Sequence, residues 1–339
     1  MWFPVPPTGY GGIEWVVWLL ANGLVDAGHD VTLFASGDSH TKARLESVYE
    51  TAPSELIGTS IVELHHCLAC YERAGEFDVI NDHSGLSAAV IGGAVTTPVL
   101  HTVHGPLDAA GGVVYEQIAR VAPRVGLISI SLNQRTPRPD LPWVANCPNA
   151  LDFEFYPCKP HRGDYLLFLG RMGPDKGCHR AIAVAMEAGL PLKIAGKRRE
   201  PPEVEYFDEF VGPHLSDRIE YLGEVTHREK VALLQEARAT LFPIEWEEPF
   251  GLVMIESMAC GTPVVATRRG AVPQVIDHGV SGVIVDDYRQ MAATLEEADS
   301  LDPLEIRRIC EERFSPERMV ADYLNAYCAA IGRSTKGGG

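Results

Sequence analysis

Two glutamates stand eight positions apart in the stretch Glu248-Pro-Phe-Gly-Leu-Val-Met-Ile-Glu256. Pro249 and Gly251 favour a turn that opens a helix. The backbone N–H groups from Phe250 to Val253 then fall at the helix start, where they lack intrahelical partners and can bind an anion. The stretch therefore indicates a site for a ligand that carries negative charge.

The spacing of the two carboxylates bears on their chemistry. Eight residues of helix would separate the two α-carbons by roughly 12 Å, at ~1.5 Å per residue. The carboxyl groups of a glycosidase acid/base pair lie only ~5–9.5 Å apart. Glu248 and Glu256 thus fit two hydroxyl-rich groups of one long ligand better than one proton-transfer centre. The alternative is a solvated acidic helix start in which Glu248 interacts with the positive helix terminus.

Cations occur in the segment Leu169-Gly-Arg171-Met-Gly-Pro-Asp-Lys176-Gly177, which follows an apolar run. Arg171 can hold two phosphate oxygens at once and Lys176 can act as a compact charge, although a solvated basic turn is the alternative. No Asp-x-Asp triplet, the usual cue for a cation that bridges a diphosphate, occurs in the sequence. We expect catalysis without a metal, in which Arg171, Lys176 and a helix amino end stabilise a leaving phosphate.

Two further segments are candidates for ligand contacts. His104 ends the run His101-Thr-Val-His104, and a histidine at a strand end can donate to a sugar hydroxyl; a packed structural histidine is the alternative. Asn81-Asp82-His83 is a second polar cluster, of uncertain role, after a predicted strand. In Thr8-Gly-Tyr-Gly11-Gly12 the absent side chains let the backbone approach a phosphate or sugar, or simply form a structural turn.

A cysteine pair also needs weighing. His65-His66-Cys67-Leu-Ala-Cys70 contains the ligand types of a zinc or redox site. No second Cys-x-x-Cys follows, and the segment is typical of a helix over residues 61–73, in which small thiols pack into a core. We therefore expect no metal here.

Composition restricts the class of protein. The 339 residues carry a net charge of −17, with a pI near 5.1, which argues against nucleic acid as a partner. No run of eighteen apolar residues predicts a membrane span, and the first residues do not resemble a secretory signal. We expect a cytoplasmic protein whose eight cysteines are reduced.

Apolar strand-like runs alternate with helical patterns throughout the chain, which predicts an α/β protein with parallel sheets. Turn-forming residues at 146–163 indicate a linker between two domains of ~150 residues each. We predict domains over residues 1–150 and 151–315 and a terminal helix over 316–332. The predicted strands cover residues 29–36, 77–81, 98–102, 125–131, 165–170, 191–196, 219–223, 239–243 and 263–266.

The run from Glu248 to Ala266, Glu-Pro-Phe-Gly-Leu-Val-x-x-Glu-x-Met-Ala-Cys-Gly-Thr-Pro-Val-Val-Ala, resembles the signature of the retaining glycosyltransferases of family 4. The resemblance implies a GT-B fold: two Rossmann-like domains facing across a cleft, with the C-terminal helix crossing back to the first domain. It implies that Glu248 contacts hydroxyls of the donor sugar and that Glu256 holds the ribose. The segment with Arg171 and Lys176 resembles the diphosphate-binding loop of the family.

The resemblance also assigns His104 to the donor sugar and places Gly11 and Gly12 beside the donor phosphate and the acceptor. It implies a front-face mechanism, in which the donor phosphate itself accepts the proton of the acceptor. One departure is Gln274, where many relatives carry an acidic residue. The implied catalytic residues are His104, Arg171, Lys176 and Glu248; the implied donor-binding residues are Gly11, Gly12, Arg171, Lys176, Glu248, Phe250, Gly251, Leu252, Val253 and Glu256.

The sequence thus predicts a metal-independent retaining glycosyltransferase that uses a nucleoside-diphosphate sugar, with UDP-sugar as the first choice. It needs no cofactor beyond this co-substrate, and the acceptor is an unidentified small molecule, glycan or lipid. The alternatives are a sugar-nucleotide epimerase or hydrolase of GT-B fold and a non-enzymatic two-domain binding protein for small ligands. A nicotinamide dehydrogenase is disfavoured because its glycine fingerprint is lacking in both halves.

The beginning of the chain departs from the family pattern. Met1-Trp-Phe leads almost directly into Pro4-Val-Pro-Pro, whereas a family member has an apolar strand before the glycine-rich loop. We therefore expect that the first strand is missing or very short. We also expect a longer natural form with ~8–12 further apolar residues, enough for one strand and its lead-in.

Overall fold

The computed structural model describes residues 1–7, 9, 11–160 and 163–336. Its described residues form two compact units: unit 1 holds residues 1–7, 11–150 and those from 316 onward, and unit 2 holds residue 9 and residues 151–315. Thr8 and Tyr10 of the predicted glycine loop, His161 and Arg162 of the predicted linker, and the tail at 337–339 lie outside the described residues.

Unit 2 contains one sheet of six parallel strands in the order β12-β11-β10-β7-β8-β9. Its central strand is entirely apolar and buried, as expected for a strand covered on both faces. The strands are β7 (Tyr165–Leu169), β8 (Leu192–Ala195), β9 (Ile219–Tyr221), β10 (Ala237–Phe242), β11 (Val264–Thr267) and β12 (Gly282–Val285).

The helices of unit 2 begin and end at residues that suit helix termini. Glycines in the left-handed conformation flank α5 (Cys178–Ala188), and a capping box of Thr226 and Glu229 opens α7 (His227–Glu236). The remaining helices are α6 (Pro201–Phe210), α8 (Leu252–Ala259), α9 (Val272–Val275), α10 (Leu295–Ser300) and α11 (Pro303–Phe314).

Unit 1 contains two separate parallel sheets, a pair β1-β2 and a four-stranded sheet β3-β4-β5-β6. Its strands are β1 (Thr32–Phe34), β2 (Arg44–Glu46), β3 (Ile80–Asp82), β4 (Val99–Val103), β5 (Gly126–Ser129) and β6 (Trp143–Asn146). Its helices are α1 (Gly12–Asp26), α2 (Ser60–Tyr71), α3 (Leu86–Gly92), α4 (Ala109–Val121) and α12 (Pro316–Lys336).

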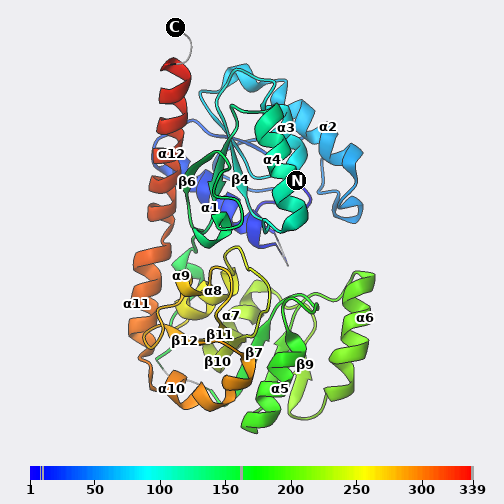
Figure 1. Cartoon of the computed structure of the whole chain (residues 1–339), viewed down its shortest axis with the longest axis vertical. Coiled ribbons are helices and arrows are strands. Elements are labelled where there is room, and N and C mark those ends of the chain that lie inside the picture. Colours follow the sequence, from blue (N-terminus) through cyan, green and yellow to red (C-terminus); the bar gives the residue numbers. More distant parts are fainter. Residues whose placement is uncertain (8, 10, 161–162, 337–339) are drawn as a thin grey trace. The chain divides into compact units, whose positions relative to one another are not determined.

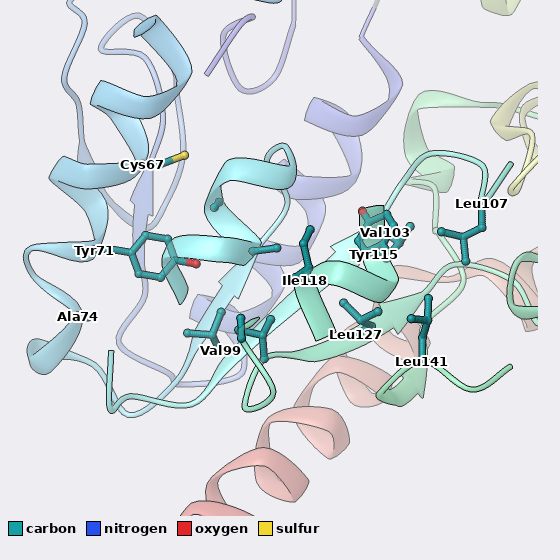
Figure 2. Packing of buried hydrophobic residues seen from close by; sticks show 14 residues of the cluster. Cys67, Tyr71, Ala74, Val99, Val103, Leu107, Tyr115, Ile118, Leu127 and Leu141 are labelled. Atoms are coloured by element: carbon teal, nitrogen blue, oxygen red, sulfur yellow. The ribbon is translucent and has the colours of Figure 1, made fainter. Parts of the chain in front are cut away.

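An apolar core covers the four-stranded sheet of unit 1 (Figure 2). Val99 and Val103 of β4 and Leu127 of β5 contribute from the sheet, and Ile118 of α4 and Cys67 of α2 contribute from the helices. Cys67 is thus a buried core residue, in keeping with the helical interpretation of its segment.

The last helix belongs to unit 1 although it is distant from it in the sequence. α12 packs against α1, β4 and β6, and it runs beside these elements in Figure 1. Tyr323 of α12 is completely buried and its hydroxyl lies 3.4 Å from the Thr102 hydroxyl of β4. Tyr327, one turn further on, donates to the Asn81 side chain over 2.6 Å.

The α/β prediction is confirmed, and every strand predicted from the sequence overlaps an observed strand. Most observed strands are shorter than the apolar runs that predicted them. β2, β6 and β12 were not predicted. β2, for example, has only three residues, two of them charged, so it lacks a recognisable apolar pattern. The last helix extends beyond the predicted end at 332.

A testable prediction follows from the packing of α12. Replacing Tyr323 with alanine should lower the free energy of unfolding by about 3–5 kcal/mol, because a buried aromatic ring is removed. Tyr323→Phe should cost less than about 1.5 kcal/mol, since only one hydrogen bond is lost. Urea denaturation of both variants measures the difference, and a cost below about 1 kcal/mol for Tyr323→Ala would contradict the described packing.

Candidate active site

In unit 2, Glu248 lies in the loop between β10 and α8. Its Oε2 accepts a hydrogen bond from the Lys176 ammonium over 2.5 Å. The same ammonium lies 4.5 Å from the centre of the Trp246 ring, within the range of a cation–π interaction. Glu248 is buried, with 8% of its surface exposed. The carboxylate is therefore held in place by a cation that comes from the loop after β7.

A glycine allows a second loop to close over the Glu248 backbone. Gly270, after β11, has φ +54°, and a Cβ there would lie 2.3 Å from the Glu248 nitrogen and 2.4 Å from its carbonyl oxygen. The neighbouring Ala271 N–H donates to that carbonyl over 2.9 Å. Any larger residue at position 270 would push the two loops apart, so the position of Glu248 depends on this glycine.

Glu256 lies within α8 and is also buried. Its Oε1 accepts from the Tyr156 hydroxyl over 2.8 Å and from the Lys230 ammonium over 2.5 Å. Lys230 comes from α7, and Tyr156 lies near the beginning of unit 2. Each glutamate of the pair is thus matched by its own lysine.

Arg171 follows β7 and makes a local ion pair, in which Nη2 lies 2.7 Å from Oδ2 of Asp175. Its side chain remains 38% exposed, more than that of Lys176 at 20%. Because a guanidinium has five N–H donors, Arg171 can keep this contact and still bind an anion.

A glycine precedes the start of α8. Gly251 adopts a left-handed conformation with φ +83° directly before the helix, and Leu252 and Val253 form its half-buried first turn. Phe250 is buried and its ring packs edge-on against Phe314 at 5.8 Å. Phe250 is therefore a core residue that anchors the loop.

The structure corrects the spacing estimate for the two glutamates. α8 begins at Leu252, so only Glu256 is helical, and an eight-residue helix does not describe the distance between Glu248 and Glu256. Sequence reasoning also missed Lys230, Tyr156 and Trp246. Lys230 and Tyr156 lie 26 and 100 positions from their common partner, and neither stands in a motif that would have indicated the contact.

In unit 1, His104 follows β4 and lies beside His83. Its Nε2 is 2.9 Å from His83 Nδ1, and the other nitrogen of His83 is 3.2 Å from Asn81 Oδ1. The Asn81 amide group donates to the Leu100 carbonyl and to the Thr102 hydroxyl, which assigns its Oδ1 as an acceptor. His83 must therefore donate from Nε2 to Asn81.

The pKa values of the two histidines show which of their ring nitrogens carry protons. Burial lowers the pKa of His83 to about 4 and lowers that of His104 well below its usual value. Both rings are thus neutral at pH 7, and His83 Nδ1 accepts the Nε2 proton of His104. The remaining nitrogen of His104, Nδ1, is then a hydrogen-bond acceptor. The sequence analysis considered His104 as a donor to a sugar hydroxyl, whereas in this network the nitrogen that remains available is an acceptor.

His101 makes separate contacts behind this pair. Its Nδ1 lies 2.5 Å from Oδ2 of the buried Asp82, and its Nε2 lies 2.9 Å from the Tyr115 hydroxyl. Burial alone would raise the pKa of Asp82, but the attraction of His101 and hydrogen bonds from His101 and Ser84 outweigh burial and lower it. Asp82 and His83 therefore serve different networks.

The two glycines predicted for unit 1 lie at the start of α1: Gly11 precedes the helix and Gly12 is its first residue. A Cβ at Gly11 would lie 2.8 Å from Cγ of Pro7, so the turn is too tight for a side chain. This close packing explains the glycine at position 11 without any ligand.

One thiol of the cysteine segment lies beside a histidine. Cys70 Sγ lies 3.7 Å from His66 Nε2, and burial raises the pKa of Cys67 to about 11 and that of Cys70 to about 12. In the described part of the chain, no three metal-ligating side chains form a group that could hold an ion.

None of the described helices has the length and apolar character that crossing a bilayer requires.

Comparisons with known proteins agree with this architecture. The family described as "Glycosyltransferase Family 4" matches residues 10–141, and "Glycosyl transferases group 1" matches residues 155–312. Similar curated proteins are a glycogen synthase of Mycobacterium tuberculosis, 26% identical over 82% of this chain and 79% of its own length, and a phosphatidyl-myo-inositol mannosyltransferase of Mycolicibacterium smegmatis, 28% identical over 86% and 81%.

Solved structures give the same result. AviGT4, a glycosyltransferase involved in avilamycin A biosynthesis, is 26% identical with a TM-score of 0.69 over 98% of this chain and 93% of its own. Anabaena Alr3699/HepE, solved with UDP and glucose, is 19% identical with a TM-score of 0.74 over 94% and 96%. The protein is a glycosyltransferase with the GT-B fold. It belongs to glycosyltransferase family 4.

The buried histidines predict a pH dependence of stability. The folded pKa values of His66 and His83 are about 4, below the unfolded value of ~6.5. Between these values the unfolded chain binds more protons, so stability rises with pH, and it is lost as the pH falls from about 6.5 towards 4. Each histidine should contribute up to about 1.4 kcal/mol per pH unit.

Urea denaturation at pH 5.0, 6.0 and 7.0 measures this slope. His83→Gln should reduce it, whereas the matched substitution His29→Gln, at an exposed position, should leave it unchanged. Equal slopes for the wild-type chain and His83→Gln would show that His83 is not a buried neutral group.

Proposed function

We propose that the protein is a retaining glycosyltransferase that moves a sugar from a nucleoside-diphosphate sugar to a hydroxyl of an unidentified small molecule, glycan or lipid. The observation that carries this proposal is that two glutamates of unit 2 each form an ion pair with a lysine. Glu248 pairs with Lys176, and Glu256 pairs with Lys230. UDP is the first choice of nucleotide, because the HepE structure of the same fold was solved with UDP and glucose.

The ion pairs suggest how the ligand is recognised. A diphosphate is a stronger partner for an ammonium than a carboxylate is, because it offers more charge and more acceptor oxygens. Lys176 and the exposed Arg171 can turn to the diphosphate, next to the amino end of α8. Glu248 and Glu256 then become acceptors for hydroxyl groups, which fits Glu248 to the sugar and Glu256 to the ribose.

The proposed reaction breaks the bond between the anomeric carbon and the phosphate oxygen. The acceptor oxygen forms its bond on the same face of the sugar, and its proton passes to the leaving diphosphate. The growing negative charge of the diphosphate is stabilised by Arg171, Lys176 and the α8 amides, whose charges are already oriented. These groups can do the work of a divalent cation, so we propose a metal-independent reaction.

Two features of unit 1 complete the proposal. His104, through Nδ1, accepts a hydrogen bond from a hydroxyl of the donor sugar. The backbone at Gly11 and Gly12, at the start of α1, contributes amide groups to the donor phosphate and the acceptor side.

Donor turnover tests the proposed function. The chain should be heated with UDP, GDP, ADP and TDP, each with EDTA, and one nucleotide should raise the unfolding temperature by several degrees. The corresponding nucleotide sugars, offered with myo-inositol and simple alkyl glycosides, should then be consumed with EDTA present, and NMR should find the product anomer unchanged from the donor.

No thermal shift with any nucleotide would refute the proposal. Strict dependence on a divalent cation would overturn its metal-independent part, and an inverted anomer its retaining part. Consumption of a donor at the same rate without any acceptor would identify an epimerase or a hydrolase instead.

Substitution of the two glutamates separates their roles. Glu256→Ala should raise the dissociation constant of the bound nucleotide about 10- to 100-fold, the effect of losing charge-assisted hydrogen bonds of ~1.5–3 kcal/mol. Glu248→Ala should change the dissociation constant of the nucleotide by less than about threefold, because the free nucleotide lacks the sugar that Glu248 is proposed to contact. It should lower the turnover of the nucleotide sugar instead. Isothermal titration with the nucleotide and initial rates measure both.

Glu187→Ala, at an exposed position of α5, is the matched control and should change neither quantity. Circular dichroism confirms that each variant is folded. Nucleotide affinity that survives Glu256→Ala unchanged would contradict the assigned division between ribose and sugar.

A further inference from the structure

A buried glutamine of unit 1, Gln134, lies where two neighbouring strands end. It belongs to the short turn η3 (Asn133–Arg135), which follows β5, and only 5% of its surface is exposed. Parallel pairing between β4 and β5 ends at Val103 and Ser129. Backbone N–H and C=O groups just beyond a sheet have lost their strand partners, and where they are buried they need others.

The side-chain amide of Gln134 supplies partners on both strands. Its Oε1 accepts a hydrogen bond from the N–H of Ile130, the residue directly after β5, over 3.0 Å. Its Nε2 donates to the carbonyl of Val103, the last residue of β4, over 2.8 Å. A primary amide carries both an acceptor and donors. Gln134 therefore takes the place of a peptide group between the two strands and continues their pairing by one step.

The same amide nitrogen also holds the loop that contains His104. Nε2 of Gln134 donates to the Gly105 carbonyl over 2.8 Å. Val103 and Gly105 are the two chain neighbours of His104, so one side chain binds the carbonyl groups on both sides of this histidine. The His104 ring is held separately, by the contact of its Nε2 with His83 over 2.9 Å. The backbone and the ring of His104 are thus fixed by two different contacts.

These contacts require the chemistry and the length of glutamine. The backbone N–H of Gln134 is itself directed to the hydroxyl of the buried Ser131 over 3.3 Å, which anchors the turn. An ionised glutamate has the same shape but can only accept hydrogen bonds, and it would face two carbonyl oxygens. A methionine fills a similar volume and offers no amide. Each of these replacements removes a defined part of the network.

We propose that Gln134 is a positioning residue of the candidate active site. It fixes the loop of His104 so that the ring keeps its hydrogen bond to His83 and presents Nδ1 to the donor sugar. The contact with the sugar rests on the proposed function. The control of the His104 ring by Gln134 concerns unit 1 alone and can be tested without any substrate.

The test uses two variants of the full chain and one control. Gln134→Glu keeps an acceptor for the Ile130 N–H but loses both bonds to the His104 loop. Gln134→Met loses all three contacts and introduces no charge, so it also serves if the glutamate variant does not fold. Gln117→Glu, at an exposed position of α4, is the matched control. Circular dichroism and urea denaturation measure the folding and the stability of each variant.

NMR spectroscopy at pH 7.0 measures the network without a substrate. The ring signals of His104, identified by their loss in His104→Gln, should show a proton on Nε2 in the wild-type chain and in Gln117→Glu. Both variants at position 134 should show a mixture of the two neutral ring forms instead. The Ile130 N–H should exchange with solvent about tenfold faster or more in Gln134→Met, but within about threefold of the wild-type rate in Gln134→Glu, where its acceptor remains.

Kinetics measures the consequence for the reaction. Turnover of the nucleotide sugar should fall about 10- to 100-fold in both variants at position 134, the effect of a group displaced by about an ångström. The dissociation constant of the free nucleotide should change by less than about threefold, because the proposed nucleotide contacts lie in unit 2. A glutamine that only stabilised the fold would lower the resistance to urea and leave the turnover of the folded enzyme unchanged.

Unchanged His104 ring signals in both Gln134→Glu and Gln134→Met would overturn the proposal. Wild-type turnover in the two folded variants would overturn it as well. If the wild-type chain neither binds a nucleotide nor consumes a nucleotide sugar, the proposed function fails instead, and the NMR comparison by itself decides whether Gln134 controls the His104 ring.

Discussion

Parallel strand pairing is the constraint on which the rest of this protein depends. A buried strand must satisfy its N–H and C=O groups on both sides, and parallel strands bring their carboxyl ends to one edge of the sheet. In unit 2 this condition is met around β7. The loop after β7 contains Arg171 and Lys176, the loop after β10 contains Glu248, and the loop after β11 contains Gly270. These loops meet in the same region of unit 2. The geometry of the candidate site in unit 2 is a consequence of the strand order.

Charge pairing is the second determinant of the site. A buried carboxylate without a partner would be costly, and Glu248 and Glu256 each have a lysine at 2.5 Å. These pairs hold the two carboxylates in fixed positions.

In unit 1, the buried titratable groups of the candidate site are histidines. His83 and His104 are kept neutral by desolvation, and a chain of hydrogen bonds from Asn81 determines which nitrogen of each ring carries the proton. The helix that supports Asn81 through Tyr327 comes from the far end of the chain. Among the described strands of this unit, β1 and β2 form a pair that is separate from the sheet β3-β4-β5-β6.

The sequence by itself determined the α/β class and the positions of most strands. It also predicted ligand-binding roles for a set of polar residues, namely Glu248, Glu256, Arg171, Lys176 and His104. These follow from local information, since apolar runs, turn residues and a nearly continuous motif can be recognised within short windows. Only the tertiary structure revealed that Lys230 and Tyr156 hold Glu256, that His104 is an acceptor, and that Phe250 is a core residue. Those facts depend on contacts between residues far apart in the chain and on burial, neither of which leaves a periodic or local signal in the sequence.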